Sequence, residues 1–61
     1  MNDLLRKQVN ELKENKGISF IFLIRELKWS KSTFYNWKYS QYDLSDDKII
    51  QLSELLNQLN N

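Results

Sequence analysis

Side chains that can form hydrogen bonds with DNA bases recur at helical spacing in the middle of the chain. They are Lys31, Ser32, Tyr35 and Asn36, which share one side of a helix that begins at Lys31. A lysine ammonium group can donate to O6 or N7 of guanine, and an asparagine amide can form two hydrogen bonds with adenine. Tyr35 can contact a thymine methyl group or donate to a phosphate. We therefore interpret this side of the helix as a candidate surface for reading bases in a major groove.

A second set of side chains suits the phosphate backbone of the same ligand. Lys38 and Tyr39 lie at the end of the same helix, Lys28 precedes it, and Lys16 precedes the apolar segment before it. Contacts from such residues to phosphates set the position of a protein on a duplex and add affinity that does not depend on base sequence. These four residues are the predicted phosphate contacts.

The distribution of charge along the chain agrees with this assignment. The whole chain has a net charge of only +1. Residues 25–40 contain four basic side chains and one acidic side chain, whereas residues 41–61 contain one basic and four acidic side chains. The net charge is therefore +3 in the segment with the candidate surface and −3 in the segment that follows it. Excess positive charge favours binding to a polyanion, and ordinary solvated surface charge is the alternative interpretation.

The composition argues against several other functions. The chain has 61 residues, no cysteine and no histidine, so it lacks the commonest metal ligands and the commonest general base. So small a domain has little space for a substrate pocket, which is typically about 300 Å³ or more. We expect no enzyme activity, no metal and no cofactor. The longest apolar run, residues 20–24, is too short to cross a membrane, and no signal peptide is visible, so we expect a cytoplasmic protein.

Four helices are expected to position these residues. Proline is absent and Gly17 is the only glycine, which favours an all-α domain. Apolar residues recur three or four positions apart, and polar residues that can act as N-caps precede each periodic segment. The expected helices cover residues 3–15, 20–27, 31–38 and 45–59.

The ends of these helices follow from individual residues. Asn2 or Asp3 is expected to cap the first helix, Ser19 the second and Ser30 the third. Gly17 can take the left-handed conformation that ends the first helix.

The aromatic residues define the expected core and also suggest an alternative. Phe34 and Trp37, three positions apart, are predicted to face inward, with Trp29 between the second and third helices. The alternation of aromatic and polar residues over 35–40 also fits a strand paired with the apolar run over 18–24. The helical interpretation is preferred because the segment between the two runs contains neither glycine nor proline for a hairpin turn.

Two short helices joined by a tight turn form a helix-turn-helix. The arrangement resembles the phage Cro and repressor type of this motif, the λ-repressor-like or XRE family. The resemblance rests on SKSTFYNWK at residues 30–38 and on SDDKIIQL at residues 45–52, and it extends over about residues 4–56. It implies a compact four-helix domain and a transcriptional regulator, encoded by a phage or mobile element, that binds double-stranded DNA. It also places Lys31, Ser32 and Asn36 at positions where base contacts are common.

The chain departs from the family pattern at three places. Ile24 stands where the family often has alanine, and Lys28 stands where it has a glycine in the turn. Lys28 is therefore expected to adopt a positive φ, at a cost of about 1 kcal/mol. Large apolar residues replace polar ones over positions 20–22.

These apolar residues support an alternative function. The inward face of the helix 20–27 is already filled by other side chains, so at least one of the three is expected to stay exposed, as at a protein interface. The residues predicted for such an interface are Phe20, Ile21 and Phe22, and the end of the fourth helix, with Leu55 and Leu59, is a competing dimer surface. The surface can form a homodimer that reads two half-sites about 34 Å apart. It can instead capture another regulatory protein, as an antirepressor or inhibitor does, and a purely structural assembly subunit is a third interpretation.

Overall fold

The computed structural model describes residues 1–60, and Asn61 lies outside the described residues. Its helices are α1 (Asn2–Lys16), α2 (Phe20–Leu27), α3 (Lys31–Lys38) and α4 (Asp46–Asn60). No residue in the range 1–60 belongs to a strand, so the all-α prediction is confirmed and the hairpin alternative is wrong. None of the helices in this range is long and apolar enough to span a bilayer.

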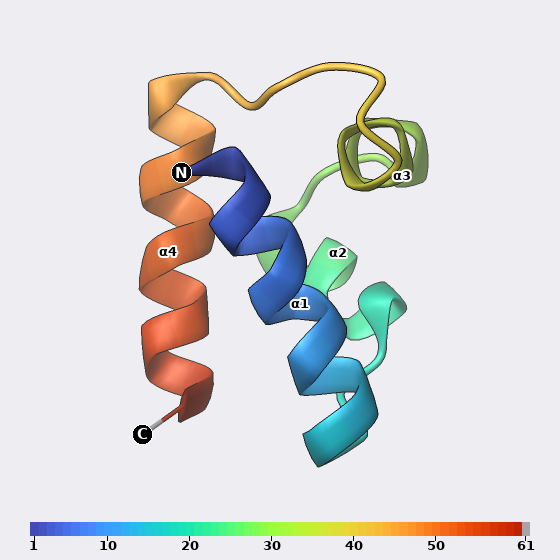
Figure 1. Cartoon of the computed structure of the whole chain (residues 1–61), viewed down its shortest axis with the longest axis vertical. Helices are drawn as coiled ribbons and strands as arrows, with labels where there is room; N and C mark the ends of the chain where they lie inside the picture. The colour runs from blue at the N-terminus through green and yellow to red at the C-terminus, as the bar shows by residue number, and fades with distance from the viewer. Residues whose placement is uncertain (61) are drawn as a thin grey trace.

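Two long helices form one side of the molecule, and the two short helices pack against them. α1 and α4 run side by side in the same direction, and α3 lies on the opposite side of α1 from α4, seen end-on in Figure 1. The loop over residues 39–45 carries the chain across the top of this view from α3 to the start of α4. The whole domain measures 26 × 21 × 18 Å.

A single apolar core joins all four helices. Its buried members recur at helical spacing on each helix, and one more comes from the loop before α4. They are Leu5, Val9, Leu12, Phe20, Leu23, Ile24, Leu27, Phe34, Trp37, Leu44, Leu52 and Leu56. Phe34 and Trp37 are completely buried, which confirms their predicted inward orientation.

Two helices end at a residue in the left-handed conformation, and a third is followed by one. Gly17 ends α1 with φ 70°, and Lys28 ends α2 with φ 60°, as the sequence predicted for both. Ser40 follows α3 with φ 66°, which the sequence did not predict. At Lys28, the Trp29 N–H donates to the Ile24 carbonyl at 3.2 Å, and this bond satisfies a carbonyl that the helix itself leaves free.

Serine hydroxyls begin both short helices. Ser19 Oγ accepts from the Phe22 N–H at 3.1 Å, and Ser30 Oγ accepts from the Thr33 N–H at 3.0 Å. Both caps were predicted. The predicted cap of α1 is wrong, because Met1 occupies the N-cap position and no side chain caps this end. Asn2 lies inside the helix instead, and its side-chain oxygen is used elsewhere.

Candidate nucleic-acid interface

The inner side of α3 is fixed to α1 through Trp37. The Trp37 indole N–H donates to Asn2 Oδ1 at 3.0 Å, and the same oxygen accepts from the Leu44 N–H at 2.9 Å. One amide oxygen at the start of α1 therefore holds both α3 and the loop that follows it. Because the indole is completely buried and its only polar atom is paired, this contact gives α3 a defined orientation.

Arg6, one turn further along α1, ties the end of α3 to the same loop. Its Nε donates to the Trp37 carbonyl at 2.7 Å, and its Nη2 donates to the Tyr42 carbonyl at 2.9 Å. The guanidinium also forms ion pairs with Asp3 at 2.8 Å and with Asp43 at 3.1 Å. The fork of N–H groups suits this use, since one planar group reaches several acceptors at once. Asp43, the first acid after α3 in the sequence, is thereby paired with a cation.

Two further contacts fix the N-terminal half of α3. The Trp29 indole N–H donates to Gln51 Oε1 at 3.2 Å, and Gln51 Nε2 donates to the Leu27 carbonyl at 2.8 Å. Gln51 of α4 therefore holds the turn between α2 and α3. In the first turn of α3, the Thr33 carbonyl accepts from the Tyr42 hydroxyl at 2.8 Å, and this bond folds the following loop back along the helix.

The outer side of α3 carries the predicted base-reading residues. Lys31, Ser32 and Asn36 are all exposed. Their side chains form no hydrogen bond or ion pair with any other residue in the described part of the chain. Their donors and acceptors face solvent on the side of α3 opposite Trp37, so they are available to a ligand.

Tyr35, the fourth predicted base-reading residue, is only half exposed. Its ring stands edge-on to Phe20, with centroids 6.4 Å apart, and stacks on Tyr39, with centroids 6.3 Å apart. Tyr39 itself is 65% exposed. Tyr35 is thus held at the edge of the outer side, with less freedom to adapt to a base than its three neighbours.

Of the predicted phosphate contacts, Lys28, Lys38 and Tyr39 border the outer side of α3. Lys28 is exposed in the turn that leads into the helix. Lys38 is half-buried, and its ammonium lies 4.9 Å from the ring centroids of both Phe20 and Tyr39. Cation–π attraction from two rings holds this charge in place at the C-terminal end of α3.

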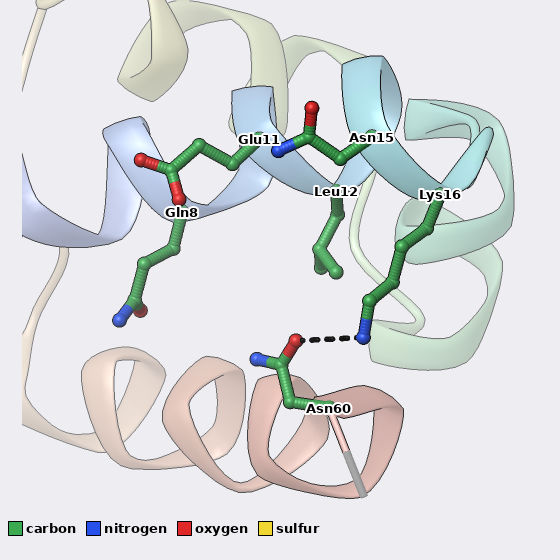
Figure 2. Close-up of a pocket in the computed structure, with 6 residues that line it drawn as sticks. All are labelled: Gln8, Glu11, Leu12, Asn15, Lys16 and Asn60. Atoms are coloured by element: carbon green, nitrogen blue, oxygen red, sulfur yellow. Dashed lines mark hydrogen bonds between the residues drawn. The ribbon is translucent and has the colours of Figure 1, made fainter.

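Lys16 does not join this group. It ends α1, at the opposite end of the long axis of the molecule from α3 (Figure 1). Figure 2 shows its ammonium extended across a hollow of about 230 Å³ between α1 and α4. There it donates to Asn60 Oδ1 at 3.2 Å. The structure therefore places Lys16 apart from Lys28, Lys38 and Tyr39, the other predicted phosphate contacts.

The predicted protein interface is only partly exposed. Phe20 is buried in the core and is removed from the interface, while Phe22 remains 40% exposed. Ile21, Leu55 and Leu59 are half-buried against the core. Phe22 and Leu59, predicted as parts of two separate surfaces, line one shallow hollow of about 370 Å³ together with Ile18.

Sequence reasoning missed the contacts that polar residues of α1 make with α2 and α3. Asn2, Arg6 and Lys13 share one side of the helix with Val9, a buried member of its apolar stripe. Asn2 and Arg6 contact Trp37 of α3, and Lys13 contacts Phe20 of α2. Their position beside the apolar stripe could have indicated that these polar residues are partly buried. The stripe alone does not indicate which helix they contact.

The search against family models, the search against curated proteins and the search against solved structures each found no match. The function is therefore inferred from the geometry of α3 and its supports.

Proposed function

We propose that the protein is a small DNA-binding transcriptional regulator of the λ-repressor-like helix-turn-helix type, with α3 placed in the major groove. One observation carries the proposal. Lys31, Ser32 and Asn36 lie exposed and unpaired within residues 1–60, on a helix whose opposite side is fixed by Trp37. A rigid helix that presents free donors and acceptors is what reading of base edges requires.

Charge supports the same function. Arg25, Lys28, Lys31 and Lys38 lie in the segment that forms α2 and α3, and the segment has a net charge of +3. The pairing of Asp43 with Arg6 leaves these cations without an acidic partner nearby in the loop. Lys28, Lys38 and Tyr39 are assigned to backbone phosphates, where they set the position of α3 and add affinity for any sequence.

The proposal is tested first with a labelled mixed-sequence duplex. Binding is measured by fluorescence anisotropy at salt concentrations from about 50 to about 200 mM. The logarithm of the binding constant is expected to fall linearly with the logarithm of salt, by about 0.9 for each phosphate contact. Lys16→Ala serves as the matched control, because Lys16 lies away from α3 and its loss leaves this slope unchanged. Wild-type protein that does not bind at low salt would contradict the proposal.

Base reading needs a second measurement. A preferred site is selected from a random duplex pool, and its affinity is compared with that of random DNA. Lys31→Ala and Asn36→Ala are each expected to weaken the preferred site by about 1–3 kcal/mol while leaving binding to random DNA nearly unchanged. Equal losses on both kinds of DNA would assign these two residues to phosphates and remove their role in specificity.

A protein-binding function is the second candidate, and Phe22 favours it. Phe22 is a large apolar side chain that is 40% exposed beside the hollow lined by Ile18 and Leu59. Such a surface suits an antirepressor or inhibitor that captures a regulatory protein, or a homodimer. Under the DNA-binding proposal, Phe22→Ser leaves the affinity for a single half-site unchanged. Absence of DNA binding by the wild-type chain, together with an oligomer that Phe22→Ser dissociates in sedimentation, would favour this candidate.

A further inference from the structure

Two lysines from different helices approach the same aromatic ring. The ammonium of Lys13, on α1, lies 4.8 Å from the centroid of the Phe20 ring. The ammonium of Lys38, on α3, lies 4.9 Å from the same centroid. The two charges are therefore no farther apart than the sum of these distances. Two like charges held this closely repel one another, so the site is favourable for an anion that lies near both.

No acidic side chain within residues 1–60 neutralises these lysines. The ion pairs of the described chain are formed by Arg6 with Asp3 and with Asp43, and neither Lys13 nor Lys38 donates a side-chain hydrogen bond there. The Phe20 ring holds both ammonium groups by cation–π attraction, which leaves their N–H donors free. The ring thus fixes the charges without using their capacity to bind an anion.

The pair of lysines is continuous with the outer side of α3. Lys38 also lies 4.9 Å from the Tyr39 ring, Tyr39 stacks on Tyr35, and Tyr35 meets the edge of Phe20. We call these five residues, Lys13, Phe20, Tyr35, Lys38 and Tyr39, the Phe20 cluster. Its position beside the candidate base-reading residues suits the phosphate backbone that borders an occupied major groove.

We infer that Lys13 is a DNA-contacting residue, and that it binds the same segment of phosphate backbone as Lys38 across the ring of Phe20. The inference rests on the proposed DNA-binding function and adds to it a contact from α1. It also gives Phe20, first predicted as part of a protein interface, a different role. The ring is the buried platform on which two cations from separate helices are held at one surface.

The test compares the salt dependence of binding to a mixed-sequence duplex for a set of matched variants. Lys13→Gln and Lys38→Gln remove one cation each, and the double variant removes both. Lys7→Gln is the control, because Lys7 is exposed on the same helix and contacts no aromatic ring among the described residues. Lys13→Arg keeps the charge over the ring. Thermal unfolding of each variant verifies that the domain is folded.

Lys13→Gln and Lys38→Gln are each expected to reduce the salt slope by about 0.9, and the double variant by about 1.8. When salt is raised from about 50 to about 200 mM, the factor by which affinity falls is then roughly 3.5-fold smaller for each single variant than for wild type. Lys13→Arg and Lys7→Gln keep the wild-type slope. If wild type binds with a steep salt slope, and Lys13→Gln keeps that slope as Lys7→Gln does, the inference is overturned and the proposed function remains intact. A wild-type protein with no salt-dependent binding would overturn the proposed function and the inference with it.

Discussion

The two sides of α3 differ in how their polar groups are used. On the inner side, the indole N–H and the carbonyl of Trp37 are both bonded, to Asn2 and to Arg6 of α1. On the outer side, Lys31, Ser32 and Asn36 form no side-chain hydrogen bond within residues 1–60. In a helix of eight residues, polar groups that are satisfied internally lie beside polar groups that are left free. The inner side of α3 therefore holds the helix in place, and its outer side is available for binding. Each side can be changed without the other.

The largest loss of stability is expected when Trp37 on the inner side of α3 is replaced. Trp37→Ala removes a completely buried indole and leaves Asn2 Oδ1 without its indole donor. The free energy of unfolding is expected to fall by about 3–5 kcal/mol, a large part of the stability of a small domain. Urea unfolding followed by circular dichroism measures it. Tyr39→Ala, which removes a ring that is 65% exposed on the outer side, should cost less than about 1 kcal/mol. Similar losses for both would mean that the two sides do not differ in packing.

Arg6→Lys tests how much the polar contacts on the inner side of α3 contribute to stability. A lysine keeps the positive charge but cannot donate to Trp37, Tyr42 and the two aspartates from one planar group. The free energy of unfolding is expected to fall by about 1.5–3 kcal/mol, the range for hydrogen bonds to a charged group. Lys7→Arg, an exposed change one residue away, should lie within about 0.5 kcal/mol of wild type. If Arg6→Lys matches that control, the guanidinium contacts do not hold the loop in solution.

The smallest effect is expected at Lys28 and Ser40, the left-handed residues that follow the two short helices. Ser40→Gly should raise the free energy of unfolding by about 1 kcal/mol, because glycine adopts a positive φ without the steric cost of a side chain. Lys28→Gly should give a similar gain in stability, but it also removes a predicted phosphate contact and lowers the salt slope of DNA binding by about 0.9. Thermal unfolding and duplex titration of the same two proteins separate these effects. A loss of stability for Ser40→Gly would show that Ser40 does not hold a positive φ.

Much of this arrangement could be predicted from local residues. The bounds of α2 and α3 agree with the prediction because Ser19 and Ser30 bond to the first turn of each helix and leave little freedom in where it begins. The positive φ of Lys28 was predictable because this residue stands where the family that the sequence resembles has a glycine in the turn. Signals of this kind depend on residues within a few positions of one another.

The remainder depends on contacts between distant residues. Arg6 meets Trp37 of α3, and Lys13 meets Phe20 of α2, only because of the angles at which α1 packs on these helices, and the sequence pattern of α1 does not determine those angles. Phe20 was assigned to the surface because three other residues already filled the inward face of α2, yet the ring is buried between α1 and α3. The contact between Lys16 and Asn60 at the end of α4 could not be predicted for the same reason.

The oxygen of Asn2 also has a consequence for how the domain folds. It bonds to residues that lie 35 and 42 positions later in the chain, so the first turn of α1 is completed only by segments far from it. Before α1 docks, the buried indole N–H of Trp37 has no partner, so we expect α2 and α3 not to form a stable unit by themselves, and docking must overcome the entropy of closing a loop of this length. We expect amide hydrogens of α1 and α3 to exchange with solvent in a single cooperative event. During synthesis on the ribosome, the surface formed by α3 would become ordered only after Leu44 has emerged.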